Sequence, residues 1–428
     1  MTSLRFYGGV EGEIGGNQIL LQDGETRILL DLGVNFSRWR RYFSFPLSRP
    51  RGMEDYFRVG LIPEALREPG EAYIRRDLDA CIITHPHSDH YGAACALPPD
   101  DVPVYLGEAA YRIISAKMEG RRGPEAKAFS QLEFRTFRTG TRISIGDVEV
   151  VPWHVDHSTP GSYVLLVYTS GGLVVYTGDF RVHGSFGQRL TEERGQFWHR
   201  LEGEEVKAFI CEGTNIGEPV SPLSERDVEH FMQECVEECR GLAIVNTSTC
   251  DVDRLKTVCQ VAERTNRRVV ATKHFLVVLE ALKDDEKLAA PKVGVDVLPY
   301  EDELDELKAH QPDYMLLTSF YRGKEILEVE PIPGSCFILS SSEPFEEEGE
   351  IEFTRLKNWL HLFGVPIYHV HTSGHALPMH LLQVVEKLSP ATVYPVHTEA
   401  PEAFCRLVGG VLGEGRVIPP ERGVVYEV

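Results

Sequence analysis

The stretch THPHSDHYG, residues 84–92, carries four side chains of metal-binding type, His85, His87, Asp89 and His90. It directly follows the apolar run Ala80–Ile83, which has the length and composition of a buried strand. His85 and His87 are two residues apart and point to one side if the strand direction continues, while Asp89 and His90 lie in the turn that follows. Two donors on each side suit two adjacent cations better than one.

Length and composition predict a globular protein of two domains. A chain of 428 residues exceeds the roughly 250–300 residues at which single hydrophobic cores stop growing. The nine cysteines form no regular framework, and Cys235 and Cys239 fall on one apolar helical stripe, which favours helix core over a metal pair. With no signal peptide and no membrane-spanning run visible, we expect a cytoplasmic protein without membrane contact.

The net charge of −21 argues against bulk, sequence-independent adhesion to nucleic acid. Two local basic runs remain: the arginine-rich segment 37–51 with its interleaved aromatic residues, and Lys117, Arg121 and Arg122. They fit a strip for a polyanion and equally fit solvated surface residues.

The pattern of elements changes along the chain. In the first half, apolar runs flank the turn signals Asp23-Gly24, Gly146-Asp147 and Ser170-Gly171-Gly172, which predicts three antiparallel hairpins. From about Ser221 helices and strands alternate, beginning with a capping box at Ser224–Asp227. The sequence therefore predicts a β-rich domain interrupted by an inserted parallel α/β domain.

Further metal-type donors stand at the ends of other apolar runs. His157 precedes one strand of a hairpin, Asp179 follows the run Val174–Thr177, and His397 follows Thr392–Val396. Loops at strand ends collect functional groups, so these three residues are candidates to complete the ligand set of the first cluster.

The sequence resembles the metallo-β-lactamase superfamily, whose HxHxDH motif stands here at 85–90, and within it the β-CASP nucleases, most closely the ribonuclease J branch. The matching motifs span most of the chain: GEIGGN at 12–17, DLG at 31–33, the His157 segment, TGD at 177–179, CEGTN at 211–215, HTSGHA at 371–376 and PVHTE at 395–399.

The resemblance implies an αββα sandwich with an inserted α/β β-CASP domain. The expected division is a first sandwich part at 1–218, the insertion at 219–366 and a closing sandwich part at 367–428. It also implies two zinc ions per chain, with manganese as the alternative. One ion would take His85, His87 and His157, the other Asp89, His90 and His397, with Asp179 bridging and a hydroxide between the ions as nucleophile.

The resemblance also assigns supporting roles. Asp31 would orient the nucleophile or a ligand histidine, His375 would protonate or stabilise the leaving 3′ oxygen, and Glu212 would hold that imidazole. His371, Thr372, Ser373 and Gly374 would contact substrate phosphates. Because a helix is expected to begin near Ala376, free N–H groups at its start favour a phosphate there, although Ser373 as a simple helix cap is an alternative.

The function implied is a zinc-dependent ribonuclease acting on single-stranded RNA, as a 5′ to 3′ exonuclease more than as an endonuclease. A small-molecule metallohydrolase of the same sandwich and a 3′-end processing endonuclease or assembly subunit are the alternatives. Glu212 stands where ribonuclease J has aspartate, and the segment 318–323 also departs from its pattern. Because the chain ends at Val428, dimerisation through the carboxyl-terminal domain of ribonuclease J is not expected, and another oligomer stays open.

Overall fold

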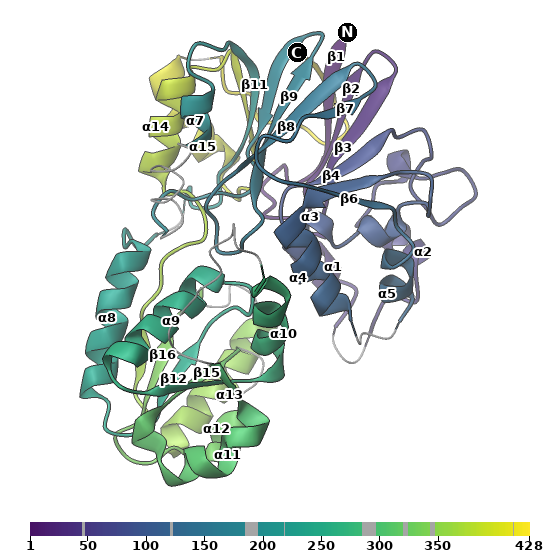
Figure 1. Ribbon diagram of the computed structural model, residues 1–428. Coiled ribbons are helices and arrows are strands. Elements are labelled where there is room, and N and C mark those ends of the chain that lie inside the picture. The colour runs from purple at the N-terminus through teal and green to yellow at the C-terminus, as the bar shows by residue number, and fades with distance from the viewer. Residues whose placement is uncertain are drawn as a thin grey trace.

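The computed structural model describes residues 1–44, 48–119, 123–184, 196–217, 219–284, 297–319, 324–342, 347–413 and 415–428. Arg121, Arg122 and the segment 320–323 lie outside the described residues. The protein consists of two facing sheets, covered by helices on their outer sides, and a third sheet below them (Figure 1).

The first sheet has seven strands. Their order is β19 (Val425–Glu427), β1 (Thr2–Gly8), β2 (Gln18–Asp23), β3 (Thr26–Leu32), β4 (Ala80–Ile83), β5 (Val104–Gly107) and β6 (Phe134–Phe137). Its outer face carries α1 (Phe36–Arg40), α2 (Met53–Arg58), α3 (Ser88–Tyr91), α4 (Glu108–Met118) and α5 (Pro124–Phe129). Short 3₁₀ turns lie at Glu64–Leu66 and Ala94–Ala96.

The second sheet has six strands. Their order is β18 (Thr392–Val396), β11 (Val206–Glu212), β10 (Gly172–Tyr176), β9 (Tyr163–Thr169), β8 (Val148–His154) and β7 (Ile143–Ile145). The helices α7 (Phe197–Arg200), α14 (Pro378–Leu388) and α15 (Pro401–Leu412) cover its outer face.

Alternating side chains explain the layers. In β3, Ile28 and Leu30 point into the core between the two sheets, where they meet residues such as Val167 and Val174. Leu29, between them in the sequence, belongs instead to the core under the outer helices. Both cores are buried apolar clusters, so the αββα sandwich implied by the sequence is confirmed.

The third sheet is parallel throughout and also has six strands. Their order is β14 (Val297–Pro299), β13 (Arg268–Ala271), β15 (Tyr314–Thr318), β12 (Ala243–Asn246), β16 (Cys336–Leu339) and β17 (Ile367–His369). One face packs against α8 (Glu225–Glu238), α9 (Val252–Arg264) and α10 (Lys273–Leu282). The other packs against α11 (Tyr300–Ala309), a 3₁₀ turn at Gln311–Asp313, α12 (Lys324–Val329) and α13 (Glu347–Leu362).

The order of the strands explains how this unit is inserted. β11 pairs in parallel with β18, Ala208 opposite Thr392, so the chain leaves the sandwich after one strand and returns beside it. The expected boundary after 366 falls just before β17, which pairs with β16 of the third sheet. A division that followed the sheet would therefore assign β17 to the inserted unit.

The three hairpins form as expected. β2 pairs with β3, β7 with β8 and β9 with β10, all antiparallel. The capping box is present at the start of α8, where the Ser224 hydroxyl accepts from the Asp227 N–H and the Asp227 carboxylate accepts from the Ser224 N–H. Cys235 and Cys239 pack in the apolar cluster under α8, as the helical stripe indicated.

The expected helix start near Ala376 is wrong. The helix α14 begins at Pro378, with Leu377 as its N-cap residue. Proline fits the first turn because it has no N–H to satisfy, and its ring disfavours helical conformation at the residue before it. The helix-terminus argument for phosphate binding at 372–374 therefore does not hold.

The arginine-rich segment is partly structural. The Arg38 guanidinium pairs with Glu13 and donates to the Gly60 carbonyl at 2.6 Å, which leaves it little freedom to meet a ligand. Arg41 and Tyr42 are exposed beside it. Within the described residues, the helices are all too short or too polar to span a membrane.

Candidate metal centre

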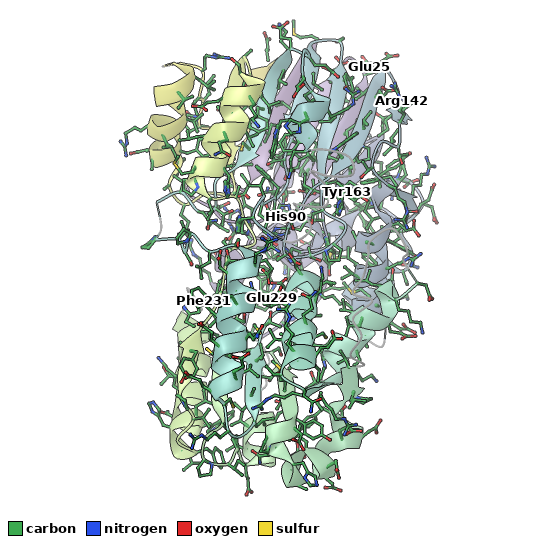
Figure 2. All side chains as sticks on the ribbon, turned by 60° about the vertical axis from the view of Figure 1, so that its left-hand side comes forward. Glu25, His90, Arg142, Tyr163, Glu229 and Phe231 are labelled. Carbon is green, nitrogen blue, oxygen red and sulfur yellow. The ribbon has the colours of Figure 1, made fainter. Side chains whose placement is uncertain are left out.

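The metal-type donors predicted from the sequence come from the ends of several strands. His85 and His87 follow β4, His157 follows β8, Asp179 follows β10 and His397 follows β18. Asp89 and His90 lie on the short helix α3 rather than in an irregular turn. Figure 2 places His90 at the lower end of the sandwich, above α8. Residues more than 300 positions apart therefore share one site.

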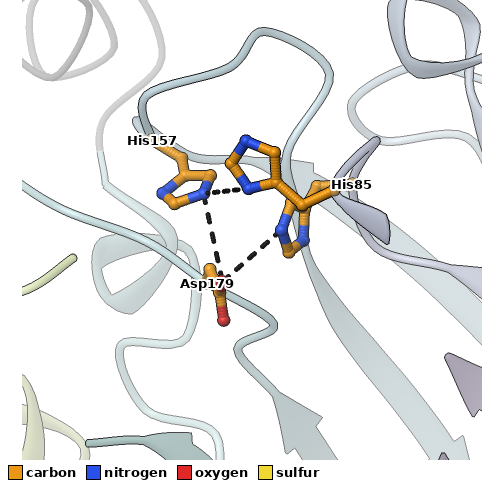
Figure 3. A group of neighbouring side chains, drawn as sticks. His85, His157 and Asp179 are labelled. Atoms are coloured by element: carbon orange, nitrogen blue, oxygen red, sulfur yellow. Dashed lines mark hydrogen bonds and ion pairs between the residues drawn. The ribbon is translucent and has the colours of Figure 1, made fainter. Parts of the chain in front are cut away.

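The seven residues form two groups whose candidate ligand atoms lie within 4.8 Å of one another. One group is His85, His87, His157 and Asp179, and the other is Asp89, His90, His397 and Asp179. Figure 3 shows the rings of His85 and His157 directed at the Asp179 carboxylate. Asp179 Oδ2 is 3.4 Å from His85 Nε2, 3.3 Å from His90 Nε2 and 3.7 Å from His397 Nε2.

Most of the imidazoles are fixed by the ring nitrogen that points away from this centre. His90 Nδ1 lies 2.7 Å from Asp31 Oδ2, and His157 Nδ1 lies 2.6 Å from the Gly374 carbonyl. The same nitrogen of His85 lies 3.1 Å from the Thr84 hydroxyl, and that of His397 lies 2.8 Å from the Thr214 hydroxyl. Such outer partners set the tautomer and aim the inner nitrogen, as is usual around bound metals.

The inner atoms fit a metal. Nε2 of His85, Nε2 of His90 and Oδ1 of Asp179 are buried without a hydrogen-bond partner, which is costly unless an ion is bound. Burial lowers the pKa values of His85 and His157 well below the ordinary histidine value, which favours the neutral ring that a metal binds. The His/Asp cluster is therefore a metal-ion site.

Asp31 holds residues of this centre in place through hydrogen bonds of its carboxylate. Its Oδ1 accepts from the Thr84 N–H at 2.7 Å, and its Oδ2 accepts from the Tyr176 hydroxyl at 2.7 Å in addition to its contact with His90. Tyr176 was missed in the sequence, where it reads only as an apolar strand residue. Its place in β10, three positions before Asp179, is the signal that could have found it.

Two site residues hold a strained backbone. Asp31 has φ 57° and His397 has φ 54°, in the left-handed region that non-glycine residues seldom adopt. Gly33 lets the chain after β3 pass close to the backbone of Asp89, since a Cβ on Gly33 would lie 1.6 Å from the Asp89 carbonyl oxygen. Strain of about 1–3 kcal/mol per residue persists only where surrounding contacts enforce it, here those of the metal centre.

His375 lies beside the donors with its predicted partner Glu212. Its Nδ1 is 3.4 Å from Glu212 Oε1 and 3.8 Å from Asp179 Oδ2. Burial lowers the pKa of His375, but the charges of Glu212 and Asp179 outweigh it and raise the pKa to about 9. In the metal-free protein these carboxylates therefore favour the charged form of the His375 ring.

Thr214 joins this pair to the metal centre, a role that sequence reasoning missed. Its hydroxyl is 2.8 Å from Glu212 Oε2, 3.0 Å from His375 Nδ1 and 2.8 Å from His397 Nδ1. The Thr214 hydroxyl therefore lies within hydrogen-bond distance of Glu212, His375 and His397. Its position inside the CEGTN motif is the available signal.

The segment 371–374 borders the same site, and its members differ in exposure. The Thr372 side chain is buried and donates to the Leu223 carbonyl, whereas His371, Ser373 and Gly374 are half-buried. The Ser373 hydroxyl accepts from the His375 N–H at 3.1 Å. It therefore shapes the turn that presents His375 and does not cap α14.

The sequence and the fold are similar to those of known proteins. Residues 26–197 match the family model of the beta-lactamase superfamily domain. Ribonuclease J of Sinorhizobium meliloti is 30% identical over 343 residues, 76% of this chain and 58% of the relative. Ribonuclease J of Corynebacterium glutamicum is 26% identical over 93% of this chain and 54% of the relative. The chain thus spans somewhat over half the length of these two relatives.

A solved structure supports the fold. The crystal structure of a protein of unknown function from Enterococcus faecalis V583 superposes with a TM-score of 0.76 at 21% identity and covers 99% of both chains. The sequence match to ribonuclease J covers 93% of this chain, so it includes both the sandwich and the inserted parallel sheet. The chain therefore carries a beta-lactamase superfamily domain at residues 26–197 and is similar to ribonuclease J over most of its length.

Proposed function

We propose that this protein is a metal-dependent hydrolase that cleaves phosphodiester bonds of single-stranded RNA and leaves 5′-phosphate and 3′-hydroxyl ends. The observation that carries the proposal is the His375–Glu212 pair beside two donor groups that share Asp179. The ribonuclease J relatives support RNA as the substrate.

The proposed cofactor is zinc, two ions per chain, with manganese as the alternative. Imidazole and carboxylate donors suit zinc, and each of the two groups supplies three donors besides the shared Asp179. Divalent ions bound there would lower the pKa of water and offset charge on phosphate oxygens.

The protein's own residues would do the rest. Asp31 would hold His90 and Thr84 in place, since its carboxylate contacts both. His375 would donate a proton to the leaving 3′ oxygen, since the Glu212 carboxylate 3.4 Å from its Nδ1 favours the charged ring. Glu212 would keep that ring protonated and oriented.

Substrate contacts would come from the half-buried members of the segment 371–374. We propose His371, Ser373 and Gly374 as phosphate contacts, with Thr372 as the buried anchor of the turn. The inserted domain, taken as 219–366 between sandwich parts 1–218 and 367–428, would form the other wall of the RNA path. A 5′ to 3′ exonuclease in the cytoplasm is the mode and place we propose.

The test uses the wild-type protein, stripped of metal with chelator and then restored with zinc, on 5′-labelled linear RNA and on the same RNA circularised. Single nucleotides released from the linear RNA, with the circle left intact, would support the exonuclease. Opening of the circle would assign an endonuclease mode. No cleavage of either RNA by zinc-restored protein would refute the function.

A further inference from the structure

A buried arginine joins the metal centre to the inserted unit. Arg181 follows Asp179 by two residues, and its side chain has no exposed surface. Its guanidinium donates to Asp253 Oδ2 at 2.7 Å, to Asp156 Oδ1 at 3.3 Å and to the Ser373 carbonyl at 3.4 Å. One side chain therefore contacts three segments that are far apart in the sequence.

Each contact reaches a different part of the molecule. Asp156 directly precedes His157, whose ring contacts the Gly374 carbonyl at 2.6 Å. Ser373 lies in the same turn, two residues before His375. Asp253, by contrast, stands in the first turn of α9, a helix that packs on the third sheet. Arg181 thus connects α9 to the turn that carries His375.

A second buried arginine extends the contact into the inserted unit. Arg254 donates to Glu225 Oε1 at 2.7 Å and to the Ser340 carbonyl at 2.7 Å. Glu225 Oε2 in turn lies 3.7 Å from Arg181 Nη1. All these charges are buried, so removal of one partner weakens the compensation of the others in a medium of low dielectric.

Attachment of the inserted unit does not depend on these charges alone. An apolar cluster contains Ala109 and Ile113 of α4 together with Val278 and Leu282 of α10. Apolar contact is non-directional, whereas hydrogen-bonded charges impose geometry. The charged network is therefore suited to set orientation, while the apolar cluster supplies association.

We propose that Arg181 and Asp253 form a latch that positions the turn 373–375, and with it His375, against the metal centre. Both are positioning residues, since they act through the Ser373 backbone. The inference rests on the proposed function, in which His375 protonates the leaving oxygen. It adds that the inserted unit sets the geometry of this step through its contacts with the buried Arg181 guanidinium.

Two substrates separate positioning from general structural damage. An RNA linkage expels an alkoxide that needs a proton, whereas a p-nitrophenyl phosphodiester of thymidine expels an anion that is stable without one. Loss of His375 should therefore slow RNA cleavage by roughly a hundredfold and leave the activated diester nearly unaffected. A misplaced His375 should also slow RNA cleavage, by less than its loss does, and should leave hydrolysis of the activated diester nearly unaffected.

The variants are Asp253→Asn, which keeps the shape of the side chain, and Arg181→Lys, with His375→Ala as reference. We expect Asp253→Asn and Arg181→Lys to lower kcat on RNA by about tenfold with little change in KM. Hydrolysis of the activated diester should stay near the wild-type rate. The matched control is Glu149→Gln, which breaks the exposed pair with Arg142 at 2.9 Å and should change neither rate.

Hydrogen exchange of the zinc-loaded protein supplies a readout that needs no RNA. Peptides that cover 371–377 should exchange faster in Asp253→Asn than in wild type, while those of β18 stay unchanged. Equal loss on both substrates, or unchanged RNA cleavage and exchange, would overturn the latch. If Arg181→Lys does not fold, Asp253→Asn alone decides. Wild-type protein that cleaves no RNA would refute the proposed function, and the exchange comparison would still judge the latch.

Discussion

The imidazole rings of the metal centre depend on partners that are not ligands. Thr84, Asp31, Gly374 and Thr214 each hold the outer nitrogen of one ring. His87 differs, because its Nδ1 faces inward, 3.1 Å from His157 Nε2. The orientation of these rings therefore depends on outer hydrogen-bond partners from several loops. Removal of His87 disturbs these outer hydrogen bonds least, because its Nδ1 makes none of them.

His87→Ala should reduce bound zinc while the fold persists. One of the two groups keeps His85, His157 and Asp179, and the other group is untouched. We expect the variant to lose about half of the bound metal and RNA cleavage to fall by a hundredfold or more, since catalysis by paired ions needs both. Elemental analysis of purified protein measures this. The matched control is His361→Ala, an exposed histidine at the end of α13, and full zinc content in His87→Ala would contradict the assignment.

His375 should make the stability of the metal-free protein depend on pH. Its folded pKa of about 9 exceeds the ordinary histidine value of 6.5, so its contribution is complete below about pH 6.5 and is lost as the pH rises through 9. His375→Gln should therefore cost on the order of 2 kcal/mol at pH 6 and little at pH 10. Urea unfolding of chelated wild type and variant at both pH values checks it. A cost that is the same at both would show that the imidazole is not held charged.

At the scale of elements, the cap of α8 gives a local test. The Ser224 hydroxyl accepts from the Asp227 N–H at 3.3 Å and donates to its carboxylate at 2.6 Å. Ser224→Ala should lower the free energy of unfolding by about 1 kcal/mol because an N–H at the helix start loses its partner. Ser221→Ala, an exposed serine three residues earlier, is the control for loss of a hydroxyl. Equal unfolding midpoints in urea for the two variants would contradict the role of the cap.

Elements could be predicted from the sequence where local signals agree. The hairpins and α8 follow from turn residues, alternation and a capping box, all of which lie within a few positions of one another. The start of α14 could not be placed, because helical periodicity continues through Ala376 and Leu377 while the proline at 378 decides the first turn. For that reason Leu377, and not Ser373, is the N-cap residue of α14.

At the scale of the whole molecule, the ligand types could be predicted but their supports could not. Asp179 and His397 follow apolar runs and His157 precedes one, and this pattern is visible without a structure. Tyr176 contacts Asp31, 145 positions away in the sequence, and Thr214 contacts His397, 183 positions away. Only the packing of the sheets brings these residues together. The latch of Arg181 and Asp253 depends equally on how the inserted unit sits on the sandwich.

Metal binding should stabilise the whole sandwich. The donors follow β4, β8, β10 and β18, so ions bound to them would tie both sheets together. An ion that binds the folded protein far better than the unfolded chain adds about 3–4 kcal/mol at 100–1,000 times its dissociation constant. We expect chelation to lower the melting temperature in calorimetry and zinc to restore it. An unchanged melting temperature would mean that the centre binds no metal tightly.

The central claim is that RNA cleavage depends on metal held by the two donor groups that share Asp179. The most direct test titrates zinc into chelated protein and plots the rate of cleavage of 5′-labelled RNA against bound zinc per chain. We expect no cleavage without bound zinc and a rate that rises until both groups are filled. Full cleavage by the metal-free protein, or none at saturation, would contradict it.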